Sequence, residues 1–328
     1  MNERNENFGP VAGIVVVGVI ALVAMTAPRL APLPVNPPTA TLVRAAVVNS
    51  PTPTRPPSTS TAPPPSPTAL PTPLSDATPT PLSPEQWQAW PILPVIGNTV
   101  RAIYERGQRL GNDPRAFSKV GDCSGTPNWF LGDFDRGPRF YSLGEHTRLS
   151  PVLEFFAGSF ERASLAAHPG FNAGSLFDAL WANPQHCEKG EGPLACEYRQ
   201  YQPSVAFIML GTNDAYHQET FESSMRQIIE YSVEHGVIPV LSTKADNLEG
   251  DNSLNPIMAR LAVDYDVPLW NYWRVAQTLP DFGLQEDGAH LTWGPNRFDD
   301  PRVMRRGWPN RNLTALQVLE AILLVVNK

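Results

Sequence analysis

A long tract rich in proline, threonine, serine and alanine, residues 28–84, limits what this chain can fold into more than any other feature. It contains runs such as PTPTRPP and APPPSPT. Repeated prolines remove backbone hydrogen-bond donors and favour the extended polyproline II conformation, so the tract builds no core of its own. We therefore expect residues 28–85 to form a disordered, semi-rigid stalk and residues 86–328 to form one globular domain.

The segment before the stalk is expected to attach the chain to a membrane. After a short tail, residues 1–10, residues 11–27 (VAGIVVVGVIALVAMTA) are uncharged and uniformly apolar, as a transmembrane helix requires. A cleaved signal peptide is the alternative, because Ala27 is small, but Met25 makes a poor cleavage site. We expect an uncleaved single-pass anchor, with the C-terminal domain outside the cytoplasm. Secretion after cleavage is the alternative.

Charge and cysteine content narrow the class of protein further. The net charge of −7 and the lack of clustered lysine and arginine argue against a nucleic-acid partner. Cys187 and Cys196 lie in the glycine-rich segment HCEKGEGPLACE, where a disulfide would suit an oxidising compartment. A zinc site is the weaker alternative, because no CxxC pair is present, so we expect neither a metal nor a cofactor. This pairing leaves Cys123 free.

Short β-branched runs alternate with helical patterns from residue 115 onward, which is typical of a parallel sheet wrapped by helices. The run SVAFIML is almost wholly apolar and predicts a central strand. We expect an α/β fold, a three-layer α/β/α sandwich whose five-stranded parallel sheet has the flavodoxin-like order 2-1-3-4-5. The predicted strands are 117–121, 159–165, 204–210, 237–242 and 267–270, and the predicted helices are 219–234, 254–265 and 313–326.

Three polar segments follow strands of this predicted sheet. They are GDCS at 121–124, GTND at 211–214 and DGAH at 287–290. Ligands of such folds bind beyond the carboxyl ends of the strands, so these segments are expected to meet at one site. Ester hydrolysis needs a nucleophile, a base and a carboxylate that orients the base, and Cys123, His290 and Asp287 are the candidates.

Stabilisation of the developing oxyanion is expected from the side-chain amide of Asn213 and the backbone amide of Gly174, in FNAGS. Asp122, Ser124 and Asp214 are candidate supporting residues. Each has a structural alternative, since Asp122 can brace its loop, Asp214 can cap a helix, and Ser124 stands one position after the expected nucleophile.

These motifs resemble those of the SGNH/GDSL hydrolase superfamily. Its four blocks are a GDS nucleophile segment, an oxyanion glycine, a GxND segment and a DxxH segment. GTND at 211–214 and DGAH at 287–290 match in full, Gly174 falls in a suitable place, and the first block reads GDC at 121–123. The resemblance spans residues 115–325 and implies an SGNH-type hydrolase fold with an esterase site.

Cysteine in place of serine permits two outcomes, a working Cys-His-Asp site or a domain that binds its ligand with little turnover. The leading hypothesis is a carboxylic-ester hydrolase, in particular a carbohydrate O-deacetylase, acting on an ester-bearing small molecule or an acylated glycan. The first alternative is a weak or inactive SGNH-like glycan-binding or adhesion module. The second is a lipid or thioester acyl hydrolase, which needs a wide apolar cleft near Cys123.

Other residues near the expected site have either a functional or a structural interpretation. Lys244 and Asp246 follow the fourth predicted strand, where they either contact substrate or form an ion pair that stabilises the loop. Aromatic residues are dense around the expected mouth, and they either stack on sugar rings or form core. The aromatic set is Trp129, Phe130, Phe134, Tyr141, Trp270, Tyr272 and Trp273.

Overall fold

A computed structural model describes residues 83–327 of the chain. The predicted tail (1–10), anchor (11–27) and nearly all of the stalk (28–85) lie outside the described residues. Within residues 83–327, no helix combines the length and apolar character needed to cross a membrane. The first element, the 3₁₀ helix η1 (Pro84–Ala89), begins two residues before the predicted start of the domain, and its Trp87 is buried in the core.

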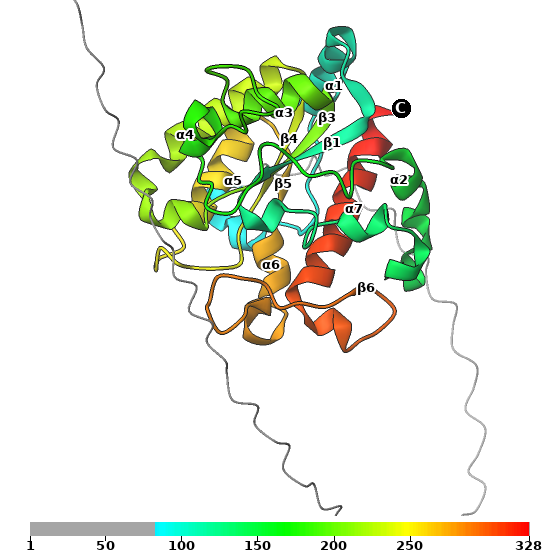
Figure 1. The fold of residues 1–328 in the computed structure, drawn as a ribbon. Helices are drawn as coiled ribbons and strands as arrows, with labels where there is room; N and C mark the ends of the chain where they lie inside the picture. The colour runs from blue at the N-terminus through cyan, green and yellow to red at the C-terminus, as the bar shows by residue number, and fades with distance from the viewer. Residues whose placement is uncertain (1–82, 328) are drawn as a thin grey trace, which may run out of the picture. The chain divides into compact units, whose positions relative to one another are not determined.

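The core of the domain is a parallel sheet with the order β1-β3-β4-β5 (Figure 1). Its strands are β1 (Asp113–Gly121), β3 (Pro203–Met209), β4 (Ile238–Ser242) and β5 (Leu269–Trp270). A separate pair of short parallel strands is formed by β2 (Tyr141–Ser142) and β6 (Asn296–Arg297). The structure therefore confirms an α/β fold with a parallel sheet, and this sheet has four strands.

The central strand behaves as its apolar sequence predicts. Every residue of β3 is buried, because the strand is paired on both edges and covered on both faces. Phe207 of β3 packs edge-on against the rings of Phe117, Phe130 and Trp270. These aromatic contacts join three parts of the chain that are far apart in sequence.

The predicted second strand, 159–165, is not present as a strand among the described residues. Its neighbourhood makes only a single parallel bridge to the sheet, between Gly121 and Ala167. Four of the five predicted strands are therefore present in the described sheet, and the fifth is not confirmed. The segment nevertheless runs beside β1, on the side of the sheet where a fifth strand was expected.

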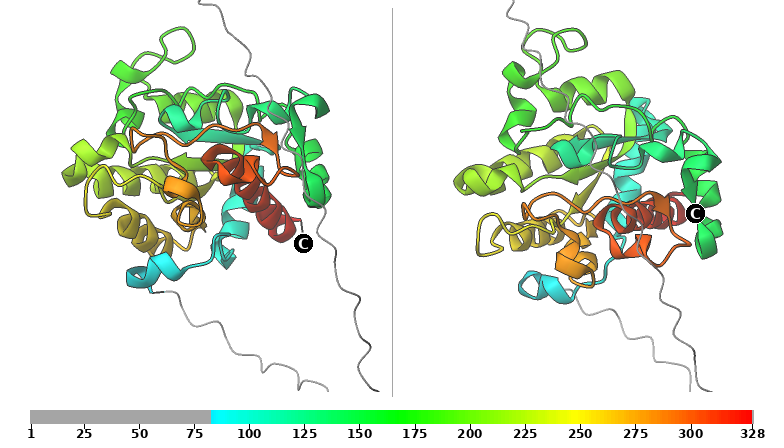
Figure 2. Two further views of the ribbon diagram at one scale, coloured as in Figure 1. Left: turned by 90° about the horizontal axis from the view of Figure 1, so that it is seen from below. Right: turned by 60° about the horizontal axis from the view of Figure 1, so that its bottom comes forward.

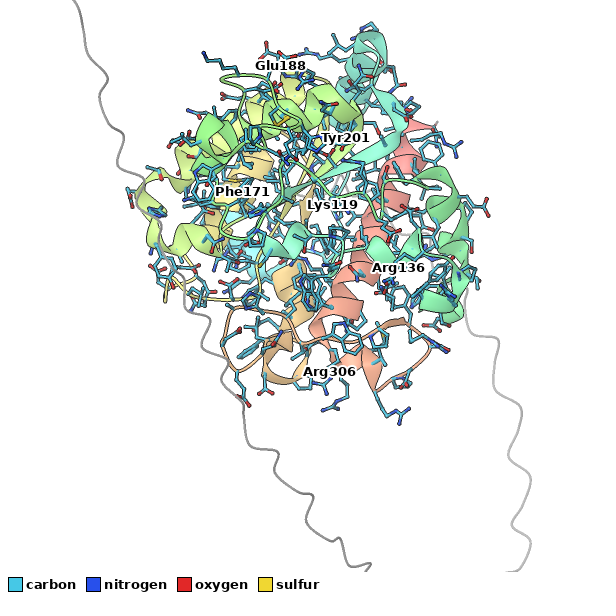
Figure 3. All side chains as sticks on the ribbon, viewed as in Figure 1. Lys119, Arg136, Phe171, Glu188, Tyr201 and Arg306 are labelled. Carbon is cyan, nitrogen blue, oxygen red and sulfur yellow. A yellow bond between two sulfur atoms is a disulfide. The ribbon has the colours of Figure 1, made fainter. Side chains whose placement is uncertain are left out.

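Side-chain groups explain why this segment does not pair as a strand. The backbone N–H of Leu165 donates to the Glu197 carboxylate at 2.7 Å, so it is not available to a neighbouring strand. The ammonium group of Lys119, near the centre of the domain in Figure 3, donates to the carbonyl of Phe160 at 2.7 Å. Polar side chains thus replace the backbone ladder that the apolar pattern suggested.

Helices pack around the sheet (Figure 2). α3 contacts β1, α4 contacts β4, and α5 contacts β4 and β5, whereas α7 contacts α1, α2 and α6. α4 and α5 match their predicted ranges to within one residue, but α7 begins six residues earlier than predicted. The helices are α1 (Asn98–Leu110), α2 (Ser150–Phe155), α3 (Pro193–Tyr201), α4 (Gln218–Glu234), α5 (Leu254–Asp264), α6 (Tyr272–Ala276) and α7 (Gly307–Val326).

Candidate active site

The first motif, GDCS, lies directly after β1 because the ends of β1 and β3 approach closely. A side-chain carbon at Gly121 would lie 2.1 Å from the backbone oxygen of Met209, so only glycine fits there. Asp122 then turns the chain, its carboxylate accepting the backbone N–H of Ser124 at 2.8 Å. Asp122 is buried, and burial raises the pKa of its carboxyl group. Cys123 is thereby placed at the carboxyl edge of the sheet.

The second motif, GTND, forms the turn after β3. The Asp214 carboxylate accepts the backbone N–H of Gly211 at 2.9 Å and that of Ala173 at 2.8 Å. The side-chain amide of Asn213 donates to the carbonyl of Phe171 at 2.8 Å. Asp214 and Asn213 therefore join this turn to the segment that carries Gly174, and Asp214 acts as a structural brace.

The third motif, DGAH, supplies a histidine that is oriented by a carboxylate. His290 Nδ1 lies 2.7 Å from Asp287 Oδ2. The backbone N–H of His290, together with that of Ala289 and the His290 ring, holds the pKa of Asp287 at about 2. Asp287 is therefore ionised at neutral pH and accepts the Nδ1 hydrogen, which leaves the Nε2 lone pair of His290 free to accept a proton.

The structure brings Cys123 to this histidine, although the two residues are separated by 167 positions. Cys123 Sγ lies 3.6 Å from His290 Nε2, which is hydrogen-bond reach for sulfur. Burial, followed by the negative charge of Asp122, raises the pKa of the Cys123 thiol to about 11. The thiol is therefore neutral at pH 7, and a reaction at sulfur requires a base to remove its proton.

A cavity of about 170 Å³ opens beside the thiol. Of the residues that the sequence predicted, Asp122, Cys123, Ser124 and His290 line it. Gly174, Asn213, Asp214 and Asp287 do not. The remaining lining residues are Trp129, Met209, Leu210, Thr212, Ser242, Thr243, Lys244, Ala245, Asp246, Gln285, Ala289, Leu291, Trp308 and Arg311.

Arg311 and Trp308 are cavity residues that sequence reasoning missed. Both belong to the first turns of α7, before residue 313, where the helix was predicted to begin. No clear signal for them is present in the sequence, because both lie before the apolar run by which the helix was recognised.

Of the two alternatives for Lys244 and Asp246, the structure shows the ion pair. Lys244 Nζ lies 2.7 Å from Asp246 Oδ1 and also pairs with Glu249. Thr212 donates its hydroxyl to the other Asp246 oxygen at 2.9 Å. The pair thus stabilises the loop after β4, and the same two residues line the cavity wall.

Most of the aromatic residues around the expected mouth form core. Phe130, Phe134, Trp270 and Tyr272 are buried, and Tyr141 and Trp273 are partly buried against the core. Trp129 differs, because it is 43% exposed, lines the cavity and stacks on Trp308 at a ring distance of 6.0 Å. Of the predicted aromatic set, Trp129 is therefore the residue that offers an exposed ring to this cavity.

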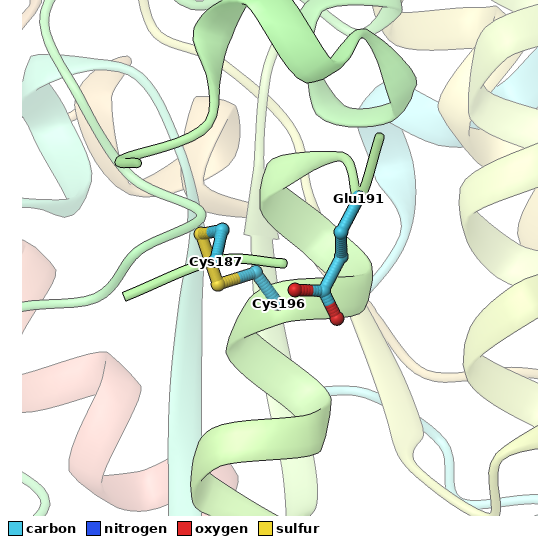
Figure 4. A group of neighbouring side chains, drawn as sticks. All are labelled: Cys187, Glu191 and Cys196. Carbon is cyan, nitrogen blue, oxygen red and sulfur yellow. A yellow bond between two sulfur atoms is a disulfide. The ribbon is translucent and has the colours of Figure 1, made fainter. Parts of the chain in front are cut away.

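Cys187 and Cys196 form a disulfide in the structure, with α-carbons 5.2 Å apart (Figure 4). Cys187 is in the loop before α3, and Cys196 lies within that helix. Together with Glu191 they make the one metal-like cluster of His, Cys, Asp and Glu side chains among residues 83–327. Both sulfur atoms are bonded to each other, and Glu191 pairs with Arg199, so this cluster does not fit a metal ion.

Comparison of the sequence with models of known protein families and with curated proteins finds no match. The function proposed below therefore depends on the geometry of the site and on the order of its motifs. Such geometry is informative by itself, because nucleophile, base and orienting carboxylate are recognised by their mutual positions.

The raised pKa of Cys123 predicts how its alkylation depends on pH. Iodoacetamide reacts with the thiolate, so the rate should rise about tenfold per pH unit from neutral pH and level off only near pH 11. The chain unfolded in urea with its disulfide intact is the reference, because its thiol should reach the plateau near pH 9. A plateau for the folded chain near pH 7 would contradict this expectation.

Proposed function

We propose that this protein is a carboxylic-ester hydrolase in which Cys123 is the nucleophile, His290 the general base and Asp287 the carboxylate that orients the base. The observation that carries the proposal is the continuous series of contacts from Cys123 Sγ to His290 Nε2, at 3.6 Å, and from His290 Nδ1 to Asp287 Oδ2, at 2.7 Å. Cys123, at the start of this series, lines a cavity where a small ester can meet the sulfur.

The proposed reaction proceeds through an acyl-enzyme. His290 Nε2 takes the thiol proton as Sγ attacks the ester carbonyl carbon, and the proton then passes to the departing alcohol when the C–O bond breaks. Water next attacks the thioester carbonyl, giving a proton to His290. Collapse of that intermediate breaks the C–S bond, releases the carboxylic acid and returns the proton to sulfur.

The proposed oxyanion donors are Gly174 and Asn213, which lie outside the lining of the cavity, on the 171–174 segment and the turn after β3. Asp214 supports this role, since it fixes the 171–174 segment against the turn after β3 through Ala173. The bond to Phe171 uses one amide hydrogen of Asn213, and an amide nitrogen carries two. The second hydrogen is the one that we assign to the developing negative charge.

We further infer membership of the SGNH/GDSL hydrolase superfamily, with a three-layer, flavodoxin-like arrangement. The order of GDC, GTND and DGAH along the chain supports this inference. The parallel bridge between Gly121 and Ala167 also supports it, because it lies at the edge of β1 where strand 2 of the order 2-1-3-4-5 is expected. The four observed strands occupy the other positions of that order.

Small substrates fit the cavity better than lipids. A long acyl chain needs a wide apolar cleft, whereas this cavity measures about 170 Å³ and has Lys244, Asp246 and Arg311 in its wall. The exposed ring of Trp129 at the same wall supports an acylated sugar, because sugar rings stack on tryptophan. We therefore retain carbohydrate O-deacetylation as the proposed activity.

A specific observation favours a second candidate, a binding module that turns over slowly. The site does not stabilise a thiolate, as the pKa of Cys123 near 11 indicates. Cysteine enzymes usually depend on a lowered thiol pKa for their reactivity. A ligand-binding domain with weak hydrolysis is consistent with that property.

Replacing His290 tests the catalytic proposal. His290→Ala should lower hydrolysis of a small aryl acetate about 10²- to 10⁴-fold, because general-base proton transfer is lost while no buried volume is removed. The matched control is His186→Ala, at an exposed histidine outside the cavity, which should leave the rate unchanged. Retention of most activity in His290→Ala would remove this residue from the mechanism.

Replacing Cys123 separates the enzyme from the binding module. Because the proton is removed during attack, the same base should serve a hydroxyl, so Cys123→Ser should hydrolyse the aryl acetate at least as fast as the natural chain. Cys123→Ala should be inactive. A natural chain without activity beside an active serine variant would support the binding module, and a serine variant slower by more than about tenfold would contradict the general-base mechanism.

We also propose that the domain is held outside the cytoplasm by the N-terminal anchor and the stalk. The apolar run at 11–27, the proline tract at 28–84 and the disulfide between Cys187 and Cys196 support this location. Protease added to intact cells should release a fragment that contains the domain. Full protection in intact cells, lost when the cells are lysed, would refute the location.

A further inference from the structure

Arg311 occupies an unusual position in the wall of the cavity. It lies in the first turns of α7 and is only 5% exposed. Its guanidinium carbon lies 4.8 Å from the ring centre of Tyr272, 5.1 Å from that of Trp270 and 5.9 Å from that of Phe130. Three buried aromatic rings therefore hold a flat cation in place.

The guanidinium group has no acceptor within the described part of the chain. No hydrogen bond or ion pair from its nitrogens is formed with residues 83–327, and the buried Nε atom is unsatisfied. The other buried cations are paired, because Lys119 donates to a carbonyl and Lys244 to two carboxylates. An unsatisfied buried donor is costly, so this arrangement points to an acceptor that the chain itself does not supply.

The nearest acidic groups do not fill that role. Asp122 and Asp246 act on Arg311 through their charge, but neither makes an ion pair with it. Asp122 accepts the Ser124 N–H, and Asp246 accepts from Lys244 and from a threonine hydroxyl. Asp246 is thus engaged elsewhere with both of its oxygens and Asp122 with one, and Arg311 lines the cavity without a hydrogen bond to either carboxylate.

We propose that Arg311 binds a carboxylate of the substrate, so that the ester cleaved at Cys123 also carries a carboxylate group. The inference rests on the proposed function for its reaction, but the binding step does not. A planar guanidinium matches a carboxylate through two parallel hydrogen bonds, and the aromatic cradle keeps its plane fixed. Because Arg311 and Cys123 line one small cavity, the carboxylate belongs to the same small ligand as the reacting carbonyl.

Two alkylating reagents test the binding step without any ester hydrolysis. Iodoacetate carries a carboxylate, and iodoacetamide is its neutral counterpart of similar size. Both form an S–C bond at Cys123 and release iodide, while the thiol proton goes to solvent. We expect the rate ratio of iodoacetate to iodoacetamide to be about tenfold higher for the folded full-length chain than for the same chain unfolded in urea with its disulfide intact.

Variants at position 311 assign the preference to the guanidinium. Arg311→Gln should lower the ratio to that of the unfolded chain. Arg311→Lys should retain only part of the preference, because the lysine ammonium group is a point charge that cannot form two parallel hydrogen bonds to a carboxylate. Arg305→Gln, an equal charge change at an exposed residue outside the cavity, should leave the ratio unchanged. Circular dichroism checks that each variant is folded.

A second measurement keeps the inference testable if Arg311→Gln does not fold. Acetate should protect Cys123 of the natural chain from iodoacetamide, and acetamide at the same concentration and ionic strength should not. Equal ratios for folded and unfolded chains, a raised ratio in folded Arg311→Gln, or a thiol closed to both reagents would each overturn the inference.

The outcome for Arg311 can be told apart from the outcome for the proposed function. A raised ratio in a chain without esterase activity would support the carboxylate site and leave a binding protein. Esterase activity with an unchanged ratio would keep the hydrolase and refute the carboxylate site.

Discussion

The close parallel pairing of β1 with β3 is the contact on which the candidate site depends. It requires glycine at position 121, where any side chain would meet the backbone of Met209. Because the strands are parallel, their carboxyl ends meet at one edge, and the residues after each strand gather there. His290 reaches this edge from beyond β5, and it meets Cys123 only because the sheet is already assembled.

Two carboxylates in the site acquire opposite properties from their surroundings. Asp287 is half-exposed and accepts two backbone N–H groups, which hold its pKa at about 2. Asp122 is buried, and its pKa is raised. The burial that surrounds Asp122 extends to Cys123 and favours a neutral thiol. The site therefore does not favour a stored thiolate, and the proposed mechanism has His290 remove the proton from sulfur during attack.

The cations of the cavity wall have different roles. The ammonium group of Lys244 donates hydrogen bonds to Asp246 and Glu249 and so fixes the loop after β4. Arg311 is held by aromatic rings, which orient its plane without using its donors. A group that is positioned but unsatisfied is suited to recognition, because a ligand gains hydrogen bonds at no cost in rearrangement. The stacked pair of Trp129 and Trp308 adds a flat apolar face to the same cavity.

The sequence by itself determined the α/β class, the central strand and the meeting of Cys123, His290 and Asp287, because apolar runs and the residues after them report directly on a parallel sheet. Tertiary structure decided what local patterns do not encode. The segment predicted as a strand at 159–165 does not pair with the sheet as a strand. Its Leu165 N–H donates instead to Glu197, which is distant in sequence. Arg311 is held at the cavity wall by three rings from two separate segments, Phe130 in one and Trp270 and Tyr272 in the other. Both outcomes depend on long-range side-chain contacts, which only the packed domain brings together.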